Sequence, residues 1–240
     1  MAKVYFKLDL EKDISNWWGS CNSQFMGVDW KLRISPKLRK KIIGKDRKSA
    51  AKFLKPFLKK LYRKDIKFIH KFKGEIKEYW AQKEEEIFKR ITLITKKPIW
   101  PPKIVCYYTT FPRGMYRIKK HFAWMQLDPK AFYTKEIFCS AILHEIFHFQ
   151  FHKYFWEYCK TLGMNKIEIN NVKEAVTFLL NKEFLDLIPF KDRGYKIHSN
   201  FRKDLSKIWH QEKNFRKLLK KASTLIKGKY SYLVRGMDKK

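Results

Sequence analysis

The 240-residue sequence predicts an α+β protein that is mostly helical, with a small antiparallel sheet packed on a pair of helices. Two observations lead to this prediction. Long segments place apolar residues three and four positions apart, which is the period of an amphipathic helix. Two short segments, 104–110 and 121–127, are instead rich in aromatic or β-branched residues, which favour strands.

Residues 1–97 are expected to form a basic helical N-terminal region. Ser35-Pro36 is a typical helix start, and a basic amphipathic helical region is expected from there to residue 73. A further helix is expected over about 75–92, ending before Pro98.

Three prolines, Pro98, Pro101 and Pro102, form a stiff connector, so we expect a second domain over 98–240. The two predicted strands come first in it. Helices are then expected over about 135–160, 171–187 and 199–222, from their apolar spacing.

The formal net charge of +32 is spread unevenly. Residues 31–73 hold 18 Lys or Arg against two acidic residues, and 196–240 hold 14 against three. Such flanks attract nucleic acid or other polyanions. The alternative is that these lysines are solvated faces of ordinary helices in a lysine-rich chain, and both interpretations stay open.

No apolar segment follows the first residues, and the four cysteines form no C-x-x-C pair. We therefore expect a cytoplasmic protein with reduced thiols. The most apolar segment, 137–159, carries several charged or ionisable residues, which favours a buried helix over a transmembrane segment.

The strongest motif is His144-Glu145-Ile146-Phe147-His148. Two histidines four residues apart lie on one face of a helix, so both can bind a single metal ion. Glu145 is turned about 100° from His144, close enough to reach a metal-bound water. The alternative is three core polar residues that are satisfied by hydrogen bonds.

A catalytic zinc site needs a third protein ligand. His152 continues the four-residue spacing of the two histidines, but it lies about 12 Å along the helix from His144. One ion cannot bind both, so His152 is expected to support the ligands or to pack in the core. Glu174 and Glu168 compete, and we favour Glu174 because a helix holds a ligand rigidly. Asn181, two turns later, could support the site or serve as a cap or surface residue.

This pattern resembles the gluzincin-type zincin metallopeptidases. The resemblance implies a zincin-like domain that binds Zn²⁺ through His144, His148 and Glu174, with Glu145 as general base on a peptide or protein substrate. It also implies that an edge strand, here 121–127, binds extended peptide. A nucleic-acid or anionic-surface binding protein on the same scaffold, with a structural or lost metal, is the alternative.

The negative oxygen that develops during hydrolysis needs a donor besides the metal. Tyr195 and His198, which follow the third ligand in a predicted loop, are the candidates. A surface histidine and a packed tyrosine are the alternative interpretation of these two residues.

Overall fold

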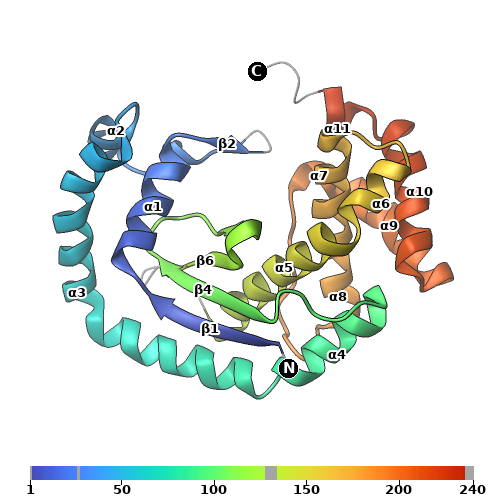
Figure 1. The fold of residues 1–240 in the computed structure, drawn as a ribbon, viewed down its shortest axis with the longest axis horizontal. Coiled ribbons are helices and arrows are strands. Elements are labelled where there is room, and N and C mark those ends of the chain that lie inside the picture. The colour runs from blue at the N-terminus through green and yellow to red at the C-terminus, as the bar shows by residue number, and fades with distance from the viewer. Residues whose placement is uncertain (1, 26–27, 128–133, 236–240) are drawn as a thin grey trace. The chain divides into compact units, whose positions relative to one another are not determined.

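The computed structural model describes residues 2–25, 28–127 and 134–235, and they form two compact units (Figure 1). Unit 1 consists mainly of Lys83–Pro102 and Leu143–Lys240, and unit 2 of Lys3–Gln82 and Lys103–Ile142. This division differs from the boundary expected between residues 97 and 98. The difference arises because the N-terminal strand pairs with a strand that follows the proline connector.

Unit 2 contains a four-stranded sheet in the order β1 (Lys3–Leu8), β4 (Lys103–Thr109), β6 (Phe122–Gln126) and β5 (Met115–Arg117). The neighbours β1, β4 and β6 are parallel, and only β5 is antiparallel to β6. The prediction of an antiparallel sheet is therefore wrong. The three-residue β5 reverses the chain before β6 begins, so β6 returns parallel to β4.

The prediction that 121–127 forms an edge strand is also wrong. β6 pairs with β4 on one side and with β5 on the other, so the outer strands are β1 and β5. The turn before β6 consists of the 3-10 helix η2 (Ile118–Lys120) and His121, whose backbone has a positive φ of 54°. A second, two-stranded sheet pairs β2 (Gln24–Phe25) with β3 (Val28–Asp29).

The helices of unit 2 begin where side chains cap them. Asp9, Ser35 and Asp46 accept hydrogen bonds from the first-turn amides of α1 (Leu10–Cys21), α2 (Pro36–Ile42) and α3 (Arg47–Ala81). This confirms the helix start at Ser35-Pro36. The 3-10 helix η1 (Trp30–Arg33) precedes α2.

The apolar face of α3 packs against α1, and the two helices lie side by side (Figure 1). Leu54 and Leu58 of α3 are fully buried in one cluster with Ile14 and Trp17 of α1. Burying the apolar face in this way leaves the basic side of α3 to solvent. Within α3, Asp65 has non-helical backbone angles and kinks the helix.

Unit 1 is helical, and α5 (Lys135–Tyr154) enters it at Leu143. Aromatic packing joins the end of α5 to α10 (Phe215–Lys227), because Phe147 of α5 and Phe155, directly after α5, both contact Phe215 edge to face. The remaining elements are α4 (Glu84–Thr95), α6 (Trp156–Thr161), α7 (Lys166–Ala175), η3 (Val176–Leu179), α8 (Leu180–Glu183), η4 (Lys196–His198), α9 (Ser199–Glu212), α10 (Phe215–Lys227) and α11 (Tyr232–Arg235).

In the part of the chain that the structure describes, each helix is too short or too polar to cross a membrane. The four cysteines are buried and unbridged, in agreement with the expectation of free thiols.

Candidate metal centre

Three side chains from two helices of unit 1 converge on one point. His144 and His148 lie one turn apart on α5, with ring centroids 4.4 Å apart. Glu174, near the end of α7, places its Oε2 3.6 Å from His144 Nε2 and 3.3 Å from His148 Nε2. The possible ligand atoms of all three lie within 4.8 Å of one another, close enough to hold a metal ion.

The donor set and the distances fit zinc. A tetrahedral ion with bonds of about 2.1 Å has ligand atoms about 3.4 Å apart, and the two His–Glu distances bracket that value. The centre is also shielded from solvent, since the side chains of His148 and Glu174 are only 2 % and 5 % exposed and that of His144 18 %. Buried imidazoles and a carboxylate need such a partner or strong hydrogen bonds.

The geometry distinguishes the two glutamates considered for the third ligand. Glu168 is the third residue of α7, and its Oε2 accepts a hydrogen bond of 2.7 Å from the Asn165 amide in a capping box. That role orients Glu168 toward the start of α7. Glu174 lies at the other end of the same helix, beside both histidines.

Asp192 contacts His144 at Nδ1, the ring nitrogen that does not face Glu174. Its Oδ1 lies 3.0 Å from His144 Nδ1, which leaves Nε2 for a metal. Its Oδ2 accepts hydrogen bonds of 2.8 Å from both Thr177 and Arg202. This carboxylate was not predicted from the sequence, because it lies in an irregular segment with no spacing signal.

The segment around Asp192 is itself held in place. The backbone N–H of Asp192 donates to Asn181 Oδ1, and Asn181 Nδ2 donates to the backbone oxygen of Asp192. Asn181 therefore supports the site indirectly, by holding Asp192, which in turn contacts His144. A supporting role was one of the alternatives predicted for Asn181. Gly194 has a positive φ of 58°, and a Cβ there would clash with the Arg202 guanidinium. Only glycine gives Arg202 room to reach Asp192.

A buried lysine, Lys173, contacts Glu174, the candidate third ligand. Its side chain is 1 % exposed, and its Nζ lies 2.7 Å from Oε1 of Glu174. Oε2 is the oxygen that faces the histidines, so Lys173 occupies the other one and leaves one oxygen for a metal.

The pKa values of His144, His148 and Glu174 differ strongly from those of free side chains. Burial lowers the pKa of His144, but Asp192 and Glu174 outweigh it and raise the pKa to about 10. Burial lowers the pKa of His148 to about 3. Burial raises the pKa of Glu174, but His148 and Lys173 outweigh that effect and hold it well below its usual value. Of the three side chains, His144 is therefore the one that is protonated near neutral pH in the metal-free protein.

Glu145 and His152 were also predicted to belong to the site or to support it. Glu145 is half-buried beside His144, and its charge contributes to the raised pKa of that histidine. His152 stacks on Trp156, with ring centroids 4.7 Å apart, in agreement with a packing role.

His198 is fully buried, with Nε2 2.7 Å from Asn171 Oδ1, and burial lowers its pKa to about 4. Tyr195 is half-buried and packs edge to face on His198. This geometry gives no support to an oxyanion role for His198, and the role of Tyr195 stays a prediction.

The chain was compared with protein-family models, with curated proteins and with solved structures, and none of the three comparisons finds a match.

Proposed function

We propose that this protein is a zinc-dependent metallopeptidase. The observation that supports the proposal most strongly is the convergence of His144, His148 and Glu174, with Glu145 next to the first histidine. Two histidines and one glutamate form a donor set that catalytic zinc sites use. Peptide bonds are proposed as the substrate because the His-Glu-x-x-His motif resembles that of the zincins.

Three donors favour a catalytic over a structural metal. Structural zinc sites use four protein ligands, whereas catalytic sites use three and keep one position for water or substrate. Among the described residues, His144, His148 and Glu174 are the group of three or more that could hold an ion. His144 is also the most exposed of them, which leaves a side from which substrate can approach.

Each residue then has a chemical task. Zinc, when bound, would polarise the substrate carbonyl and lower the pKa of a water molecule to about 7. Glu145 would accept a proton from the attacking water and pass it to the leaving nitrogen as the C–N bond breaks. Asp192 would keep His144 in the tautomer that presents Nε2, and Lys173 would hold Glu174 to one ligating oxygen.

The test is Glu145→Gln, assayed by cleavage of a mixed fluorogenic peptide library and of casein. We expect the variant to keep one zinc per chain and to lose at least about a hundredfold in rate, since general base catalysis contributes about 10²–10⁴. Glu157→Gln, the same change at an exposed position of α6, is the matched control and should retain full activity.

The alternative function, a polyanion-binding protein with a structural or lost metal, gives a different result. In that case Glu145→Gln would change neither zinc content nor anion binding, and the wild-type protein would cleave none of the peptides. Hydrolysis that survives in Glu145→Gln would also refute the assignment of the general base.

A further inference from the structure

A hollow in unit 2 gathers four positive side chains. Lys12, Arg47, Arg117 and Lys120 line a cavity of about 180 Å³, together with aromatic rings that include Trp18. The described residues that line it include no aspartate or glutamate. They come from α1, the start of α3, the end of β5 and the turn before β6, so distant parts of the sequence are brought together by the fold.

Aromatic rings and one serine hold three of these cations without neutralising them. Lys12 Nζ lies 4.8 Å from the centre of the Phe122 ring, and Arg117 lies 5.7 Å from that of Trp124. Arg47 donates two hydrogen bonds to Ser15. An exposed glutamate, Glu11, contacts Arg47 at 3.3 Å and balances one of the four charges. The hollow therefore keeps a net positive charge.

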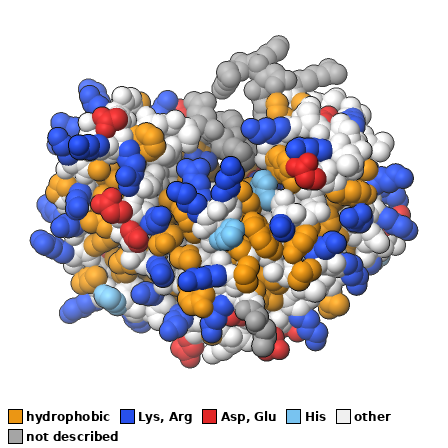
Figure 2. All heavy atoms as spheres, viewed as in Figure 1, with side chains coloured by type: hydrophobic (Ala, Val, Ile, Leu, Met, Phe, Trp, Pro, Cys, Tyr) orange, Lys and Arg blue, Asp and Glu red, His pale blue; other side chains and the backbone are white. Residues whose placement is uncertain are grey.

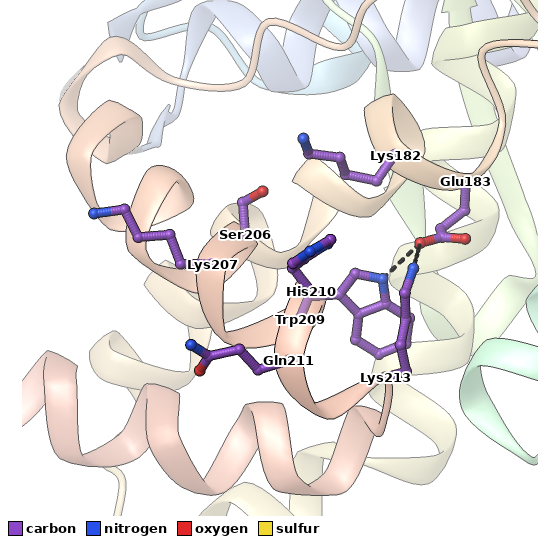
Figure 3. A pocket seen from close by; sticks show the side chains of 8 residues that line it. All are labelled: Lys182, Glu183, Ser206, Lys207, Trp209, His210, Gln211 and Lys213. Carbon is purple, nitrogen blue, oxygen red and sulfur yellow. Dashed lines mark hydrogen bonds and ion pairs between the residues drawn. The ribbon is translucent and has the colours of Figure 1, made fainter.

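A pocket in unit 1 shows the contrast (Figure 3). It is also lined by several lysines, but Glu183 lies among them and accepts hydrogen bonds from Trp209 at 2.6 Å and from Lys213 at 2.7 Å. The Glu183 carboxylate, the Trp209 indole and the Lys213 ammonium therefore satisfy one another without a ligand. The hollow of unit 2 has no such internal carboxylate along its lining.

The positive surface continues along α3 from Arg47. Exposed cations recur three or four residues apart on one side of the helix, over about 22 Å at 1.5 Å per residue. They are Lys48, Lys52, Lys55, Lys59 and Arg63. On the face shown in Figure 2, Lys and Arg side chains clearly outnumber Asp and Glu.

The chemistry of this surface favours a polyanionic chain over a lipid bilayer. A helix that binds a membrane surface inserts an apolar face, whereas the apolar face of α3 is buried around Leu54 and Leu58. Trp18 adds a second signal, since its half-buried indole lines the hollow and is fixed by a 2.8 Å hydrogen bond to the Lys45 oxygen. A fixed aromatic ring beside cations suits an unpaired base next to its phosphate.

We propose that unit 2 binds single-stranded nucleic acid. One phosphate lies in the hollow between Arg47, Arg117 and Lys120, a base stacks on Trp18, and the backbone continues along the cations of α3. A single strand is preferred to a duplex because a paired base is not free to stack on Trp18. The proposal is independent of the metal centre, and either can fail without the other.

The test is fluorescence anisotropy with a labelled oligothymidylate of about 20 nucleotides, over a range of salt concentrations. The variant Arg117→Gln/Lys120→Gln removes two cations of the hollow. Lys196→Gln/Lys203→Gln removes two exposed cations of unit 1 and is the matched control. Circular dichroism is used to verify that each variant is folded. A further variant, Arg117→Lys, keeps the positive charge at position 117.

We expect the hollow variant to bind at least tenfold more weakly and its log–log salt slope to decrease by about 1.4, because each single-strand phosphate contact contributes about 0.7. The control should lose less than twofold, and Arg117→Lys should retain most of the affinity. Equal losses in the two double variants would overturn the proposal, because attraction would then come from net charge alone. Tighter binding to the duplex, or to vesicles rich in phosphatidylserine, would overturn it as well.

Discussion

Replacing Asp192 by asparagine should change the number of protons released when zinc binds. In the metal-free protein His144 is protonated, because Asp192 and Glu174 outweigh burial and raise its pKa to about 10. A metal can bind His144 Nε2 only after that proton has left. Glu174 is already ionised, and the low pKa of His148 leaves that ring neutral, so His144 should contribute about one proton per zinc at pH 7.5, in addition to any proton lost by a zinc-bound water.

The variant keeps the shape of Asp192 but loses its charge 3.0 Å from His144. With a pKa near the ordinary 6.5, about a tenth of His144 would be protonated at pH 7.5. Glu174, 3.6 Å away, still raises the pKa in part, so we expect the His144 contribution to fall below about 0.5 and the variant to release at least about 0.5 fewer protons per zinc than the wild type. The affinity for zinc should also fall by about 10- to 100-fold, because the carboxylate no longer orients the ring.

Isothermal titration calorimetry in two buffers of different ionisation enthalpy gives the proton count directly. Asp186→Asn, which removes an exposed carboxylate paired with Arg90, is the control and should release the same number of protons as the wild type. An equal count in Asp192→Asn and the wild type would refute the role that we assign to Asp192.

Two further predictions concern stability. Gly194→Ala should lower the free energy of unfolding by about 1–3 kcal/mol and weaken zinc binding, because its Cβ would clash with the Arg202 guanidinium. Gly44→Ala, also at positive φ but with open space around it, should leave zinc binding unchanged. Urea unfolding and zinc titration measure the two effects. In the metal-free protein the lowered pKa of His148 means that stability present above pH 6.5 is lost as the pH falls toward 3, by about 1–2 kcal/mol between pH 6.5 and 5. His144 has the opposite sign, since its raised pKa gives stability that is present below pH 6.5 and lost toward pH 10. Urea unfolding at these values, with His148→Gln as the variant that should flatten the acid side, tests the assignment; an unchanged acid slope would contradict it.

The spacing of the sequence was sufficient to place the two histidines on one helical face. An interval of four residues fixes neighbours on a helix whatever the rest of the chain does, so His144 and His148 could be paired from the sequence. Glu174 was favoured by its helix, and the structure brings it to both histidines, although it lies at the end of α7 rather than at its start.

The residues that support the ligands could not be predicted in the same way. Asp192 meets His144 across 48 positions of sequence, from a segment without regular structure. Arg202 and Lys173 carry charges that usually face solvent, yet both are buried beside a carboxylate, Arg202 at Asp192 and Lys173 at its sequence neighbour Glu174. Local patterns do not show that these two side chains are buried.

The topology of the sheet was hidden for a similar reason. β1 pairs with β4 in register from Lys3 opposite Lys103, so its partner lies about a hundred residues away. The three residues of β5 are too few to show alternation, yet they decide that β6 runs parallel to β4. Strand segments could be recognised from composition, but neither their order nor their direction could be.

The most direct test of the metal centre is the zinc content per chain, measured by elemental mass spectrometry on wild type, Glu174→Ala and Glu168→Ala. We predict one zinc in the wild type and in Glu168→Ala, which loses only a helix cap, and none in Glu174→Ala. A folded wild type without zinc, or loss of zinc in Glu168→Ala alone, would contradict the proposed site.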